Sequence, residues 1–131
     1  MIYPMFAMVL LTFTVMTLMG VSRINSVRTG KISIGYFRIM SGDSPEYLLK
    51  LSRHFSNLFE VPVLFYTAGL LSVALNIEHV LLPIFAWLFV LLRCIHAFIH
   101  ITYNNVIHRM LAFIAGSLCV LIIWFIVIFK L

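Results

Sequence analysis

The apolar residues of this chain are gathered into long unbroken runs, with no alternation of the kind that marks strands. A run of about 20 apolar residues is long enough to cross the hydrocarbon core of a bilayer as a helix. Runs of this length without two-residue alternation exclude a transmembrane β-barrel. The pattern therefore predicts an all-α membrane protein, a bundle of four transmembrane helices in one domain of residues 1–131. The expected helices cover about residues 4–21, 45–75, 80–103 and 106–129.

The second of these helices has clear local signals. Ser44 can cap its start, Pro45 fits the first helical position, and Glu46 complements the helix dipole. Gly42 and Asp43 complete this predicted start. Inside the helix, proline removes a backbone N–H and clashes with the preceding turn, so a bend is expected at Pro62.

Composition and charge then indicate that lipid surrounds the chain and predict how the helices are oriented in the membrane. Only 10% of the residues are charged, against about 25% in a soluble domain, so lipid must cover most of the surface. The net charge is +5, and the basic residues cluster in one stretch, which indicates orientation in a membrane and not nucleic-acid binding. The loop of residues 22–44 holds Arg23, Arg28, Lys31 and Arg38, whereas residues 76–79 hold no lysine or arginine. The first and third loops are therefore expected in the cytoplasm and both termini outside.

A polar stripe interrupts the second helix. At about 100° per residue, Arg53, Asn57 and Glu60 share one face, while His54 lies about 100° away and could face a neighbour or lipid headgroups. Charged groups at membrane depth cost several kcal/mol unless they are paired or wet. Arg53 and Glu60 could pair with each other or across helices to fix the bundle, or the stripe could form a ligand site in the interior or between subunits.

A second polar stripe lies on the third helix. Arg93, His96, His100 and Asn104 fall within an arc of about 80°. His96 and His100 have a metal-ligand spacing, but two ligands do not make a site, and no metal is predicted. The histidines could be hydrogen-bonded structural groups or could contact an anionic or polar ligand.

Together the stripes match the chemistry of glutathione, which has two carboxylates, one amino group and a thiol. Bidentate arginines suit carboxylates, and a buried acid suits an amine. The cations are Arg53, Arg93 and Arg109, the neutral donors are Asn57, Tyr103 and Asn104, and the acid is Glu60.

At this point the chain resembles a known family. The arrangement R-x-x-x-N-x-x-E-x-P, with Arg53, Asn57, Glu60 and Pro62, lies in the second of four spans of a chain of about 130 residues. This is similar to the membrane-associated proteins in eicosanoid and glutathione metabolism (MAPEG). The segment that carries Arg93, His96, His100, Asn104 and Arg109 resembles bacterial members, which implies a bacterial inner membrane.

The resemblance implies a homotrimer that holds glutathione between neighbouring subunits in the cytoplasmic half. It implies that Arg53, Asn57 and Glu60 contact glutathione and that Arg109, near the start of the fourth helix, stabilises the thiolate. Arg28, Lys31 or Arg38 could add a basic group. One departure is that histidines, His96 and His100, stand where eukaryotic members have tyrosines, with Tyr103 at the edge of the stripe.

Three functions remain open on the sequence. The first is a glutathione-dependent transferase or peroxidase acting on a lipophilic electrophile. The second is a non-catalytic lipid-binding scaffold, since the family includes such members. The third is a small proton-coupled drug transporter with Glu60 as its carboxylate. The substrate is not specified by the sequence.

Overall fold

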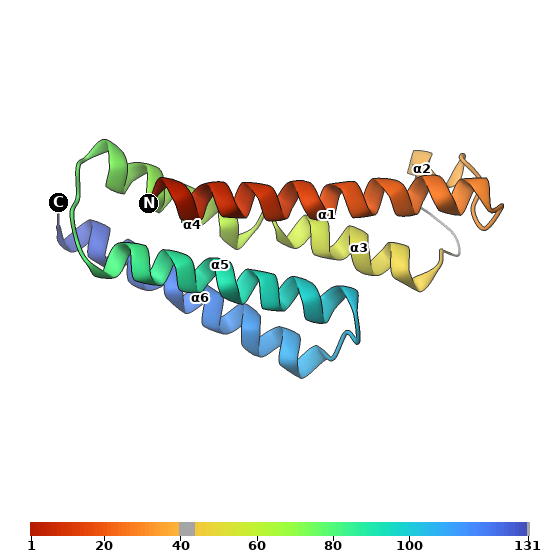
Figure 1. Cartoon of the computed structure of the whole chain (residues 1–131). Helices are drawn as coiled ribbons and strands as arrows, with labels where there is room; N and C mark the ends of the chain where they lie inside the picture. Colours follow the sequence, from red (N-terminus) through yellow and green to blue (C-terminus); the bar gives the residue numbers. More distant parts are fainter. Residues whose placement is uncertain (40–43, 131) are drawn as a thin grey trace.

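The computed structural model describes residues 1–39 and 44–130, and they form a bundle of helices. Figure 1 shows α1 running beside the α3–α4 pair and α5 beside α6, with both ends of the chain at the same end of the bundle. Four spans are long and apolar enough to cross a membrane, with α3 and α4 together forming one of them. The predicted all-α bundle of four spans is confirmed. The helices are α1 (Ile2–Arg28), α2 (Tyr36–Ile39), α3 (Glu46–Asn57), α4 (Val61–Ala74), α5 (Leu81–Ile101) and α6 (Val106–Phe129).

The helix α1 is longer than predicted, because the polar residues after its apolar run do not stop it. It ends at Arg28, where Gly30 takes a left-handed conformation with φ of 68°. The N–H groups of Gly30 and Lys31 then donate to carbonyls of the last turn, at Val27 and Ser26. A left-handed glycine just past a helix satisfies the free carbonyl groups of that end. The stop signal is therefore Gly30 and not the change in polarity at Ser22.

The predicted second helix is broken and not merely bent. The helix α3 ends at Asn57 and α4 begins at Val61, with Pro62 in its first turn. Pro62 cannot donate to the carbonyl of Leu58 and its ring crowds that carbonyl, so the chain leaves the helix between these two residues. Glu60, directly before α4, has a backbone conformation that is not helical, with φ of −94° and ψ of −98°.

The start of α3 also differs from the prediction. Pro45 is extended, with φ of −54° and ψ of 136°, so it precedes the first helical residue, Glu46. Ser44 makes no capping hydrogen bond, and its hydroxyl is buried without a partner. The capping and first-turn roles assigned to Ser44 and Pro45 were wrong, since an extended proline holds the serine away from the helix start. Gly42 and Asp43 lie outside the described residues.

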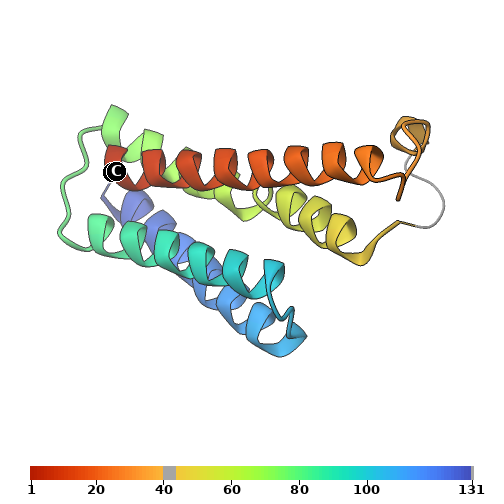
Figure 2. The same ribbon diagram turned by 45° about the vertical axis from the view of Figure 1, so that its right-hand side comes forward.

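The link between α5 and α6 is a tight turn that begins two residues before the predicted end of the third helix. Asn104 adopts a left-handed conformation with φ of 49°, and its N–H donates to the carbonyl of Ile99. Asn105 caps α6, because its side-chain oxygen accepts from the N–H groups of Ile107 and His108. Figure 2 shows this turn at the end of the bundle opposite the termini.

The half of the bundle near the termini has an apolar core. Its centre is fully buried and includes Phe65 on α4 and Phe89 on α5, whose ring centroids lie 4.6 Å apart. Gly116 brings α6 close to α5, since a Cβ atom there would lie 3.6 Å from the Phe89 ring. Small residues allow such close approach of helices in lipid. Large apolar side chains elsewhere remain exposed on all four spans, as a lipid-facing surface requires.

Candidate functional site

The other half of the bundle has a polar core. On α5, Arg93, His96 and His100 are only 1 to 2% exposed and lie between α3 and α6. His54 of α3 completes the cluster and is fully buried. Its ring centroid lies 5.5 Å from that of His96 and 5.1 Å from that of His100. We call these four residues the polar core cluster.

The position of His54 decides between two alternatives that the sequence left open. Because it lies off the face of Arg53 and Asn57, it could face a neighbour or lipid headgroups. The structure shows that it faces a neighbouring helix, since the side of α3 that carries His54 packs against α5. The signal was available, since Leu51 and Leu58 lie on the same side of the helix and are also buried.

Most nitrogens in the polar core cluster lack a partner among the described residues. These are both ring nitrogens of His54, all three guanidinium nitrogens of Arg93, and the Nδ1 atoms of His96 and His100. The Arg93 guanidinium lies over the rings of Phe89 and Phe113, at 5.2 and 5.1 Å from their centroids. A buried polar group without a hydrogen bond costs free energy, and a buried charge costs more. The cluster is therefore suited to receive hydrogen-bond acceptors or negative charge.

Arg109 links the cluster to α6. Its Nη1 atom donates to the side-chain oxygen of Asn104 at 2.9 Å and lies 3.3 Å from Nε2 of His100. The left-handed turn at Asn104 places this oxygen beside the first turn of α6. Two neighbours thus hold the guanidinium of Arg109 in place, and it is half-buried.

The predicted stripe on the second span faces outward. Arg53 and Glu60 are exposed, and Asn57 is half-buried. The one ion pair within the described parts of the chain joins Lys50 to Glu46 at 2.8 Å, so Arg53 and Glu60 do not pair with each other there. The interpretation of these two residues as a structural pair within the protomer is not supported.

A groove joins the two predicted stripes. It has a volume of about 280 Å³ and lies where α3, α5 and α6 meet. Its polar members are Asn57, His96 and Arg109. Its walls are completed by Val106, Met110 and Phe113.

The remaining predicted residues lie around this groove in different ways. Arg93 and His100 are buried behind it, and Arg53 and Glu60 lie on the outer surface. Tyr103 follows the end of α5 and is 56% exposed, with its hydroxyl 3.2 Å from Nδ1 of His108. The helical arithmetic that placed Tyr103 beside His96 required α5 to continue, which it does not.

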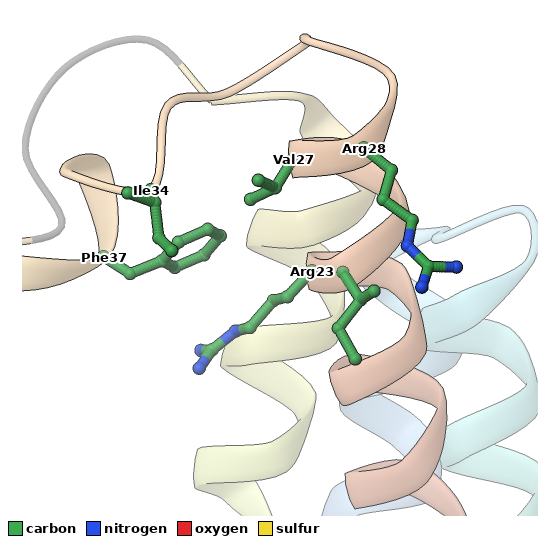
Figure 3. A pocket seen from close by; sticks show the side chains of 6 residues that line it. Arg23, Val27, Arg28, Ile34 and Phe37 are labelled. Atoms are coloured by element: carbon green, nitrogen blue, oxygen red, sulfur yellow. The ribbon is translucent and has the colours of Figure 1, made fainter.

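A second recess lies beside the C-terminal end of α1, where this helix faces the segment that carries Ile34 and Phe37. Its volume is about 350 Å³, and Figure 3 shows its lining. Val27 points toward Phe37, whereas the guanidinium of Arg28 points away on the other side of the helix. The guanidinium of Arg23 lies 5.5 Å from the Phe37 ring and donates to Ser52. None of the residues predicted for the ligand site on the second and third spans lines this recess.

No group of three or more histidine, cysteine or acidic residues within residues 1–39 and 44–130 has a geometry that could hold a metal ion. Cys94 is exposed and Cys119 is buried, and neither forms a disulfide.

The comparisons with known proteins agree with this architecture. The sequence model of the MAPEG family matches residues 1–129. No match was found among curated proteins or among solved structures.

Proposed function

The chain belongs to the MAPEG family, and we propose that it is an integral membrane glutathione-dependent transferase or peroxidase that acts on a lipophilic electrophile. The observation that carries this proposal is the groove between α3, α5 and α6. It combines an amide, an imidazole and a guanidinium from three helices, Asn57, His96 and Arg109, with apolar walls. No acidic residue lines the groove, and a lining of donors with one cation suits an anionic ligand.

The groups around the groove match the functional groups of glutathione. Arg53 offers a bidentate partner for one carboxylate, and Glu60 offers a partner for the amino group. Arg109 is the cation nearest to the groove that can face the thiol. In this arrangement Asn57 hydrogen-bonds the peptide backbone of the ligand, since an amide both donates and accepts.

A neighbouring subunit would complete the site. Arg53 and Glu60 face outward from the protomer, and the groove is slightly smaller than the range of about 300–1,000 Å³ for ligand pockets. Both facts support a site that a neighbouring subunit completes, and we propose a homotrimer in which glutathione lies between subunits. A further cation would come from Arg28 at the end of α1, from Lys31 after it, or from Arg38 of α2. The site would lie in the cytoplasmic half, with both termini outside.

The chemistry begins with the thiol. Its ordinary pKa of about 8.5 falls beside a cation, so Arg109 raises the fraction of thiolate at neutral pH. The thiolate sulfur then forms a bond to the electrophilic carbon, and the electron pair moves onto the electrophile or its leaving group. With a lipid hydroperoxide the thiolate sulfur bonds to one peroxide oxygen as the O–O bond breaks, and the lipid alcohol leaves after taking up a proton. The resulting sulfenic acid reacts with the thiol of a second glutathione, which forms the disulfide and releases water.

Thermal stability in the presence of glutathione tests binding. A ligand that binds only the folded state raises its melting temperature, so millimolar glutathione should stabilise the purified protein in detergent. Asn57→Ala should reduce this shift, and Lys130→Ala, a charge removal at the exposed far end of α6, should not. A wild-type melting temperature that does not respond to glutathione would contradict the proposal.

A lipid-binding scaffold is the second candidate, and one observation favours it. An apolar recess of about 310 Å³ lies between α1 and the break before α4. Its members include Phe13, Phe59 and Tyr66, and it contains no charged residue. An apolar hollow of this kind could hold an acyl chain. The scaffold predicts stabilisation by lipid and no response to glutathione.

A further inference from the structure

The glutathione proposal uses one histidine of the polar core cluster, because only His96 lines the groove. His54 and His100 lie behind it, and the three ring centroids are 5.1 to 5.9 Å apart. A neutral imidazole has one N–H group and one lone pair, so each partner decides which nitrogen carries the proton. One contact, between Arg109 and His100, fixes a proton position, and the proposal extends it to the other two rings.

The assignment begins at Arg109. A guanidinium donates hydrogen bonds and never accepts them. Its Nη1 atom lies 3.3 Å from Nε2 of His100, so Nε2 must supply the lone pair. His100 therefore carries its proton on Nδ1, which is buried and has no partner among the described residues.

The proton on His100 Nδ1 needs an acceptor inside the bundle. Arg93 cannot serve, since its guanidinium also only donates. The ring of His54 lies 5.1 Å away between centroids, and both of its nitrogens are buried without a partner. The inference requires the two rings to rotate about χ2, a broad torsion, until facing nitrogens come within hydrogen-bonding distance. His54 then accepts from His100 with one nitrogen and carries its proton on the other.

In the proposed relay, the N–H group of His54 then donates to Nδ1 of His96. This nitrogen is buried and unpartnered, and the two ring centroids lie 5.5 Å apart. Arg93, one turn before His96 on α5, can only add a second donor to the same atom. With Nδ1 as the acceptor, neutral His96 carries its proton on Nε2, the nitrogen left to face the groove.

We propose that His54 is a positioning residue that fixes His96 as a hydrogen-bond donor toward an anionic group in the groove. The relay runs from Arg109 through His100 and His54 to His96, with each group donating to the next. His96 thus stabilises a thiolate or carboxylate and does not act as the base that deprotonates the thiol. The identity of the anion rests on the proposed function, whereas the proton positions do not.

Nitrogen-15 NMR of the full chain in detergent micelles, with labelled histidine, tests the relay without any ligand. We expect the proton of His96 on Nε2 and that of His100 on Nδ1. His54→Gln should preserve this state, because a carboxamide also accepts at one atom and donates from another. His54→Phe keeps a ring of similar shape but no nitrogen, and should leave His96 as a mixture of tautomers. His79→Phe, in the loop at the other end of the bundle, is the control and should change neither ring.

Four results would contradict the proposed relay. A proton on Nδ1 of His96 in the wild-type protein, or an unchanged His96 tautomer in His54→Phe, would overturn the relay. One equivalent of a transition metal bound by the purified protein would also overturn it, because the ring nitrogens would then be ligands. If His54→Phe does not fold, the wild-type His100 ring still tests the relay, because a proton on Nε2 of His100 would remove its first step.

Binding measurements separate this proposal from the glutathione proposal. Loss of one hydrogen bond should weaken glutathione binding roughly threefold to tenfold in His54→Phe, with affinity close to wild type in His54→Gln. If the tautomers are as assigned and glutathione does not bind, the relay stands and the proposed function fails. If glutathione binds and His96 carries its proton on Nδ1, the function stands and the relay fails.

Discussion

The two halves of this bundle bury opposite kinds of side chain, apolar ones near the termini and polar ones near the turn between α5 and α6. Near the termini, Phe65 and Phe89 fill a core of apolar side chains that need no partners. Near the turn between α5 and α6, the equivalent volume holds three imidazoles and a guanidinium. Packing drives association of helices in lipid, so the apolar half can stabilise the fold, while the polar half carries unmet hydrogen bonds. We therefore expect the apolar half to carry most of the stability and the proposed ligand site to lie in the polar half.

The largest effect is expected in the apolar half. Phe65 is fully buried, and Phe65→Ala should lower the free energy of unfolding by about 3–5 kcal/mol, because it leaves a cavity against Phe89. Denaturant unfolding in detergent, followed by tryptophan fluorescence, measures this. The matched control is Phe129→Ala, where the ring is 80% exposed. Equal losses in the two variants would contradict the division between the halves.

The next largest effect concerns activity. Arg109→Ala should reduce glutathione-dependent turnover by about a hundredfold, as removal of a group that stabilises developing negative charge does. The thiolate absorbance of bound glutathione should fall in parallel, with little change in melting temperature. Lys130→Ala removes a cation at the opposite end of α6 and should leave turnover unchanged. Full turnover in Arg109→Ala would remove this residue from the mechanism.

A smaller effect is expected at Arg93, where removal of a buried charge could raise the free energy of unfolding. Its guanidinium is 1% exposed and has no hydrogen bond within the described chain. A hydrophobic residue of similar volume often replaces a buried charge without loss, so Arg93→Met should change the free energy of unfolding by less than about 1 kcal/mol or raise it. Denaturant titration without ligand checks this. A loss of more than about 3 kcal/mol would show that the assembled protein supplies Arg93 with an anionic partner.

A similarly small effect is expected at Trp124, whose indole N–H donates to the carbonyl of Leu64 at 3.1 Å and connects α6 to α4. Trp124→Phe should cost about 0.5–1.5 kcal/mol of stability, the net value of one hydrogen bond, and leave glutathione binding unchanged. Thermal melts with and without glutathione measure both quantities. A lost response to glutathione would show that the apolar half contributes to the site.

Hydropathy was sufficient to predict the number and type of the spans, because lipid imposes one simple requirement on them. The breaks were harder to place. Pro62 predicted a disturbance, yet the break lies earlier in the chain, at Leu58 to Glu60, since the lost hydrogen bond and the steric clash act on the preceding turn. The extension of α1 to Arg28 was missed because a polar composition was taken as a loop signal.

The site was predictable in its parts and not in its arrangement. Arg93, His96 and His100 share a face of α5, as the periodicity predicted, and Asn57 and Arg109 meet His96 in one groove. Helical arithmetic gives angles between residues of one helix and does not say which side meets the neighbouring helix. That choice depends on packing between α3 and α5, which placed His54 inside and left Arg53 outside. The roles of these residues in binding stay predictions.

A density map of the purified protein with glutathione bound is the most direct test of the central claim. The account predicts density for the tripeptide between subunits of a trimer, with its sulfur beside Arg109 and its backbone at Asn57. The recess beside Phe37 on α1 should remain free of it. Glutathione density absent from the groove, or present only in that recess, would contradict the account.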